Sequence, residues 1–84
     1  MNEKIFNAVM SVQQDNNIAF NDLRTLLSQL GFRERIKGDH YIYNRAGFPE
    51  RINIQPNGNM AKGYQIKQVR SLIIKYKMGG KSDV

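Results

Sequence analysis

The apolar residues of this chain change their spacing at Gly31, and this change most restricts the possible folds. Before Gly31 they recur every three or four residues, which is the spacing of a buried helix face. From Phe32 onward they alternate with polar residues, which is the spacing of a strand. Eighty-four residues leave room for one core, so both kinds of element are expected to share a single α+β domain.

Three helices are predicted: over residues 2–13, after Asn21, and from about Tyr64 to Tyr76. Asn21 suits the N-cap of the second helix because its side-chain oxygen can accept a hydrogen bond from an unpaired backbone N–H. Gly31 stands where the chain must adopt a left-handed conformation to leave that helix. The apolar faces of the three helices comprise Ile5, Phe6, Val9, Met10 and Val12, then Leu23, Leu26, Leu27 and Leu30, then Ile66, Val69, Leu72, Ile73 and Tyr76.

Three strands are predicted, at Phe32–Ile36, His40–Asn44 and Glu50–Gln55. Gly38 and the segment Arg45–Gly47 supply turns of hairpin length, so the strands should form an antiparallel meander. The expected order is α-α-β-β-β-α. The helices should pack on one face of the three-stranded sheet and leave the other face to solvent.

The chain is expected to form one domain over residues 1–84. Residues 1–17 are predicted as a helical extension, 18–77 as the core and 78–84 as a flexible tail with a hinge at Gly79-Gly80. The absence of cysteine excludes a disulfide framework, and a single histidine argues against a protein-only zinc site. No long apolar run and no secretory segment is present, so the expected location is the cytoplasm.

The net charge of +6 is concentrated in the second part of the chain. Residues 1–31 carry a net charge of −1, and residues 32–84 carry +7. A basic region of this density favours a polyanionic partner, because contacts to phosphates release counterions. Arg33, Arg35 and Lys37 are the candidates for phosphate contacts, and the alternative for each is an ordinary solvated strand face.

Four other residues are also candidates for contacts to nucleic acid. Lys62 and Lys67 flank the start of the third helix, where backbone N–H groups favour anions, and the alternative is ordinary helix-surface charge. Tyr41 and Tyr43 could stack on unpaired bases. The alternative for both tyrosines is packing within the sheet.

His40 is the only histidine, and it lies between a predicted turn and a predicted strand. Lone histidines are often hydrogen-bonded structural residues, so position alone does not make His40 catalytic. Strict alternation would place it with Ile42 toward the helices, although the start of the strand next to Gly38 also permits a rim open to solvent. An imidazole among cations is suited to proton transfer beside a phosphate. We therefore take His40 as the candidate general acid/base.

Four motifs follow one another between about Ile18 and Tyr76. They are Leu26-Leu27-x-x-Leu30-Gly31-Phe32, Lys37-Gly38-Asp39-His40-Tyr41-Ile42-Tyr43, Ile52-Asn53-Ile54-Gln55-Pro56 and Ala61-Lys62-x-Tyr64-Gln65-Ile66-Lys67-Gln68-Val69-Arg70. In this order and with these gaps, the chain resembles the HicA family of toxins from bacterial type II toxin–antitoxin modules. The resemblance implies a fold like a double-stranded RNA-binding domain and a ribosome-independent endoribonuclease that cleaves mRNA. It also implies a HicB-type antitoxin that covers the active site.

The family motif of glycine, a small hydroxyl residue and an essential histidine corresponds here to Gly38, Asp39 and His40. Gly38 and His40 match the motif, and Asp39 departs from it. A carboxylate would repel a phosphate that a hydroxyl contacts, or it would orient the imidazole or cap the turn. Tyr41 stands where many members have a second histidine, so the second acid would be a lysine, a tyrosine or water.

RNA carries its own nucleophile, the 2′-hydroxyl, so the expected cleavage needs no metal and no cofactor. The sequence also offers no carboxylate cluster to hold a metal ion. Two other functions stay open at this stage. One is a non-catalytic RNA-binding module that blocks translation by occupancy, and the other is a protein-interaction domain whose basic face docks an acidic partner.

Overall fold

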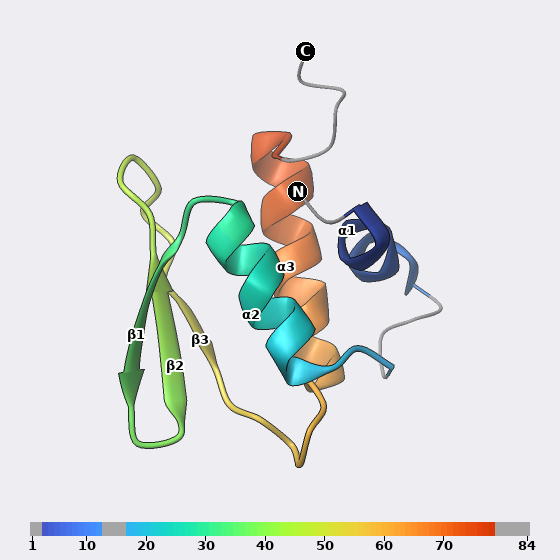
Figure 1. The fold of residues 1–84 in the computed structure, drawn as a ribbon. Helices are drawn as coiled ribbons and strands as arrows, with labels where there is room; N and C mark the ends of the chain where they lie inside the picture. The colour runs from blue at the N-terminus through green and yellow to red at the C-terminus, as the bar shows by residue number, and fades with distance from the viewer. Residues whose placement is uncertain (1–2, 13–16, 79–84) are drawn as a thin grey trace.

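A computed structural model of the chain describes residues 3–12 and 17–78, and within them it has the predicted α+β order. The elements are α1 (Glu3–Met10), α2 (Phe20–Gln29), β1 (Arg33–Lys37), β2 (His40–Asn44), β3 (Ile52–Ile54) and α3 (Gly63–Tyr76). The strands form one antiparallel sheet in the order β1-β2-β3. Helices α2 and α3 cover one face of this sheet, and α1 packs against α2 and α3 on their far side (Figure 1).

The β1–β2 connection is a two-residue turn made by Gly38 and Asp39. Lys37 pairs with His40 at the end of the ladder, so only these two residues lie between the strands. Gly38 has φ +61°, and Asp39 has no positive φ. A positive φ at the first central residue alone is the pattern of a type II′ turn, whose twist matches that of the paired strands. The predicted role of Gly38 is therefore confirmed.

The core lies between the sheet and the helices. Leu23, Leu26 and Leu27 of α2 are fully buried, as are Ile52 and Ile54 of β3. The predicted face of α2 is thus confirmed. On α3, the four aliphatic residues of the predicted face are buried, and Tyr76 packs against the core partly buried, which confirms that face as well. The remaining core residues are Ile5, Val9, Ile18, Phe20, Leu30, Phe32, Tyr43, Ala61, Ile66, Val69, Leu72, Ile73 and Met78.

Helix α2 begins one residue before its predicted N-cap, and that N-cap prediction is wrong. Ala19 occupies the cap position without a side-chain hydrogen bond, and it forms an isolated antiparallel bridge with Met60. The Phe20 N–H donates to the carbonyl of Asn59 at 2.9 Å. The bridge and this bond fix Ala19 as the N-cap and place Asn21 inside the helix, where its side chain makes another contact.

Helices α2 and α3 both end where the chain turns left-handed. Gly31 has φ +92°, and the N–H of Phe32 donates to the Leu27 carbonyl at 3.0 Å. This confirms the expectation for Gly31. At the end of α3, Lys77 has φ +53°, and the N–H of Met78 donates to the Ile73 carbonyl at 2.9 Å. Met78 is buried in the core, whereas the rest of the tail and hinge predicted at 78–84 lies outside the described residues.

Two elements are shorter than predicted. Helix α1 ends at Met10, and the side chain of Val12 is 69% exposed instead of packed. Strand β3 covers only Ile52–Ile54. Glu50, predicted at its start, accepts hydrogen bonds from Lys75 and from the Tyr76 hydroxyl, each at 2.7 Å, and so ties the β2–β3 connection to α3.

No helix in the described ranges is long and apolar enough to cross a membrane.

Truncation of one α2 leucine tests the core. Leu27 is fully buried, so Leu27→Ala should lower the free energy of unfolding by about 2–5 kcal/mol through lost burial and a residual cavity. Ile74→Ala on the outer face of α3, where the side chain is 60% exposed, should change it by less than about 0.5 kcal/mol. Urea denaturation of both variants measures the difference. Equal effects would show that α2 does not pack as described.

Candidate functional site

The solvent-facing side of the sheet brings His40 together with three cations of β1. Lys37 pairs with His40, Arg35 with Ile42 and Arg33 with Asn44. Directly paired residues in an antiparallel ladder project on the same face, so these six side chains share one surface. All three cations are exposed. We call this surface, made by Arg33, Arg35, Lys37, His40, Ile42 and Asn44, the open face.

The structure corrects the expected parity of β2. Strict alternation predicted that Ile42 would point at the helices and take His40 with it, or leave His40 at a rim of that inner face. Instead Tyr41 and Tyr43 face the helices, opposite Ile54 and Ile52 of β3. Tyr43 is fully buried and Tyr41 is partly buried. His40 therefore lies on the outer face of the sheet.

The His40 imidazole is exposed and has polar neighbours from β3. Its side chain is 48% exposed. Nδ1 lies 3.3 Å from Asn53 Oδ1, and the amide nitrogen of Gln55 lies 3.2 Å from Nε2 and 3.5 Å from Nδ1. When Nδ1 carries the proton it donates to Asn53, which leaves a lone pair on Nε2. In that tautomer the Gln55 amide can donate to the Nε2 lone pair, so a ligand that transfers a proton to Nε2 has to take the place of this amide.

Asp39 lies beside the same ring. Its carboxylate Oδ1 is 3.8 Å from His40 Nε2, and its side chain is 73% exposed. The expectation that Asp39 orients the imidazole or caps the turn stays a prediction.

Sequence reasoning missed Asn53, Gln55 and Gln65 as residues that support the site. Gln65 is fully buried at the start of α3, where its amide donates to the Gln55 carbonyl at 3.0 Å and its oxygen accepts from the Lys62 N–H at 3.1 Å. These bonds fix the backbone of the residue whose side chain touches His40. The third strand was predicted to pair with β2 and to carry Asn53 and Gln55 on its polar face. This pairing was the signal that could have placed Asn53 and Gln55 beside His40.

Three predicted contacts lie outside the open face. The Tyr41 ring packs edge-on against Phe20 with centroids 4.9 Å apart, and the Arg24 guanidinium lies 4.8 Å from its centroid. Lys62 occupies the N-cap of α3, and Lys67 is exposed on that helix. The structure thus places Arg33, Arg35 and Lys37 on the same sheet face as His40, with Lys37 directly opposite it and Gly38 in the adjacent turn, and it does not place Tyr41, Lys62 or Lys67 on that face. The alternative for Tyr43, packing, is the one realised.

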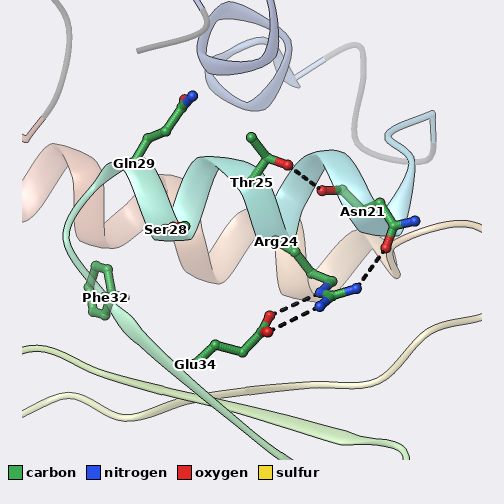
Figure 2. Close-up of a pocket in the computed structure, with 7 residues that line it drawn as sticks. All are labelled: Asn21, Arg24, Thr25, Ser28, Gln29, Phe32 and Glu34. Atoms are coloured by element: carbon green, nitrogen blue, oxygen red, sulfur yellow. Dashed lines mark hydrogen bonds and ion pairs between the residues drawn. The ribbon is translucent and has the colours of Figure 1, made fainter.

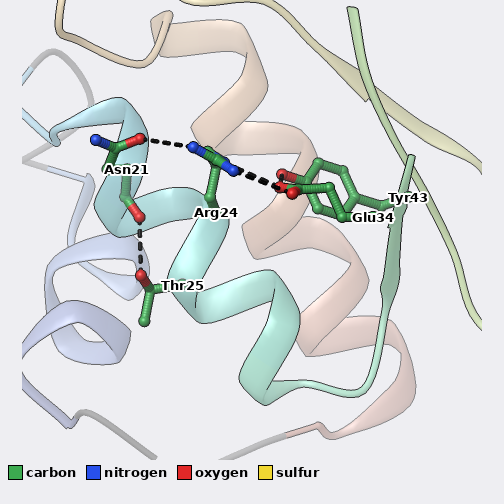
Figure 3. Close-up of polar contacts among 5 residues, drawn as sticks. All are labelled: Asn21, Arg24, Thr25, Glu34 and Tyr43. Carbon is green, nitrogen blue, oxygen red and sulfur yellow. Dashed lines mark hydrogen bonds and ion pairs between the residues drawn. The ribbon is translucent and has the colours of Figure 1, made fainter. Parts of the chain in front are cut away.

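An ion pair between α2 and β1 lies on the side of the sheet that faces the helices (Figure 3). Arg24 donates to both carboxylate oxygens of Glu34, at 2.9 and 3.0 Å. The buried Tyr43 hydroxyl donates to the same carboxylate, and Arg24 also donates to Asn21 Oδ1 at 3.0 Å. Hydrogen bonds from Arg24, together with the bond from Tyr43, hold the pKa of Glu34 below its ordinary value. Burial and the bond to Glu34 raise the pKa of Tyr43.

A groove of about 550 Å³ lies over this ion pair, between α2 and β1 (Figure 2). It is lined by Asn21, Arg24, Thr25, Ser28, Gln29, Phe32 and Glu34.

Across residues 3–12 and 17–78, no group of three or more histidine, cysteine, aspartate or glutamate side chains could hold a metal ion. No family model, curated protein or solved structure matches this chain.

The pairing of Glu34 predicts a dependence of stability on acid pH. Because the pKa of Glu34 is lowered in the folded state, its stabilising contribution is complete above the unfolded pKa of roughly 4.3 and is lost as the pH falls through the folded pKa. Glu34→Gln should therefore be less stable than the parent at pH 7 and should lose less stability between pH 5 and about pH 3.

Urea denaturation across that pH range measures both effects. Glu3→Gln is the control, because it removes one exposed carboxylate from α1 and leaves Arg24 paired. If the parent and Glu34→Gln lose stability in parallel as the pH falls, Glu34 is not held as described.

Proposed function

We propose that this chain is a small RNA endonuclease of the HicA toxin type, in which His40 acts as general acid/base. The observation that carries the proposal is the exposed imidazole on the same sheet face as Arg33, Arg35 and Lys37. RNA needs only proton transfer and charge stabilisation for cleavage, and this surface offers both. The substrate is mRNA, and no metal or cofactor takes part.

The chemistry follows from the atoms around the ring. Asn53 Oδ1 accepts from Nδ1–H, so Nε2 is the atom that takes the proton from the ribose 2′-hydroxyl. The 2′-oxygen then attacks the adjacent phosphorus, and the bond from phosphorus to the 5′-oxygen breaks. Lys37, directly across the ladder from His40, is the nearest cation in the register and stabilises the charge on the phosphate oxygens. A lysine, a tyrosine or water protonates the leaving oxygen.

The role of Asp39 differs from that of the hydroxyl residue in the family motif. Its carboxylate places a negative charge 3.8 Å from Nε2, where a hydroxyl residue would place none. The same charge repels the phosphate, so the β1 cations have to outweigh it. A HicB-type antitoxin that covers the open face would block this chemistry, and the net charge of +6 suits an acidic inhibitor.

One observation favours a second candidate function, a non-catalytic RNA-binding module that blocks translation by occupancy. The Gln55 amide lies within 3.5 Å of both ring nitrogens, and Asn53 is bonded to one of them. A ring held on both sides by amides can serve as a structural part of a basic surface. RNA would then be held by the open face without being cut.

Substitution of His40 separates the two functions. Purified protein incubated with ribosome-free RNA in EDTA should give discrete cleavage, and His40→Ala should slow it by roughly 10²–10⁴-fold because the proton acceptor is lost. Ser71→Ala is the control, since Ser71 is exposed on α3 and lies outside the open face. It should cleave at nearly the parent rate. Circular dichroism and thermal melting check that both variants fold.

Cleavage that survives in His40→Ala would contradict the catalytic assignment. Retention of RNA without cleavage by the parent, unchanged in His40→Ala, would favour the binding module. No affinity for RNA at low salt would leave the domain without a nucleic-acid function.

The salt dependence of RNA binding tests the cations of the open face. Each phosphate contact to single-stranded RNA contributes about 0.7 to the slope of log K against log salt concentration. Arg35→Gln, measured in a His40→Ala background that prevents cleavage, should reduce the slope by about that amount. Lys4→Gln on α1, which lies on the far side of the helices from the sheet, should leave the slope unchanged (Figure 1). Equal slopes for all three proteins would place the RNA elsewhere.

A further inference from the structure

Strand β1 is an outer strand of the sheet, and its second edge carries no strand partner among the described residues. The sheet order is β1-β2-β3, so β1 pairs with β2 alone. All five of its residues are exposed. A two-residue hairpin closes with a hydrogen-bonded pair, and such pairs alternate with non-bonded ones along the ladder. Since Lys37 and His40 close the hairpin, the backbone N–H and C=O groups of Glu34 and Ile36 point away from β2.

The groove over the Arg24–Glu34 pair runs beside this edge (Figure 2). It lies on the helix side of β1, and its walls carry the amides and hydroxyls of Asn21, Thr25 and Ser28. A chain paired with β1 would direct every second side chain to this side of the sheet. Ile36 projects on the same side, and its side chain is 51% exposed, so it supplies an apolar contact at the hairpin end.

The other side chains of an added strand would meet positive charge. They would lie next to Arg33, Arg35 and Lys37, which project together on the open face. Acidic side chains in the added strand would pair with these cations across the ladder. Two copies of β1 placed edge to edge would instead bring two rows of like charge together, which disfavours self-pairing.

We propose that the β1 edge binds an extended acidic segment of a partner protein by strand addition. The backbone of the segment pairs with Glu34 and Ile36, its acidic side chains face the β1 cations, and its alternate small polar or aliphatic side chains enter the groove. This interaction differs from RNA binding in its use of the β1 backbone edge and the groove, although the acidic side chains and RNA would contact the same β1 cations. It holds whether or not His40 is catalytic.

A proline at Ile36 tests the proposal without breaking the ladder to β2. The Ile36 N–H points outward, so Ile36→Pro removes a donor from the edge only, and edge strands accept proline there. The probe is a short capped peptide that alternates glutamate with threonine and valine, followed by fluorescence anisotropy. Ile36→Pro should weaken its binding by about tenfold or more, because one hydrogen bond is lost and a carbonyl of the peptide is left unpaired. Ile36→Ala, which keeps the N–H, is the matched control and should weaken binding by only a few-fold.

Amide hydrogen exchange of the unsubstituted protein gives a second measurement that does not depend on the folding of Ile36→Pro. Bound peptide should slow exchange at the Glu34 and Ile36 amides and leave Arg35, already bonded to β2, nearly unchanged. RNA binding by Ile36→Pro should equal that of the parent. The proposal is overturned if the peptide does not bind, if binding leaves the Glu34 and Ile36 amides unprotected, or if these amides become protected without peptide as the protein concentration rises. That last result would show self-pairing of the edge.

Discussion

A buried tyrosine hydroxyl must have a hydrogen-bond acceptor, and Glu34 supplies one to Tyr43 from the neighbouring strand. Arg24 of α2 holds the same carboxylate through both oxygens, so one contact joins a helix and two strands. The bond requires Tyr43 and Glu34 to project on the helix side. Because side chains alternate along a strand, His40 then has to project on the other side. A slip of one residue in β2 would bury the imidazole and expose the tyrosine.

This constraint connects the core to the proposed chemistry. On the helix side of the sheet, burial of Tyr43, Ile52 and Ile54 fixes the strands. The open face contributes little to the core, so it can hold cations and an exposed histidine without a large loss of stability. Gln65 links the two sides, since it is buried at the start of α3 and bonds the backbone of Gln55, whose side chain touches the ring. A rigid support for one exposed imidazole is what proton transfer requires.

The sequence predicts the order of elements here because local signals agree with the fold. Gly31 and Gly38 take the positive φ expected of them, and β2 has its predicted bounds. Predictions were wrong where contacts with residues far away in the sequence determine the local structure. Asn21 does not cap α2, because the residues on both sides of Ala19 bond to a loop far along the chain and fix Ala19 at the cap position. The parity of β2 was wrong because an isoleucine and a tyrosine are both suited to a buried strand position. Which of the two is buried depends on a hydrogen-bond acceptor for the Tyr43 hydroxyl. That acceptor lies on β1, so the sequence of β2 alone does not reveal it.

The account rests on the claim that His40 faces solvent on the sheet side away from the helices, within reach of an RNA held by β1. Reaction with diethyl pyrocarbonate, followed by mass spectrometry, measures this most directly because it modifies accessible, unprotonated imidazole nitrogens. In the folded protein, His40 should react at a rate comparable to that of a histidine in a short peptide, and bound RNA should slow the reaction. If His40 reacts only after the protein is unfolded, or if RNA binds without protecting it, the claim is contradicted.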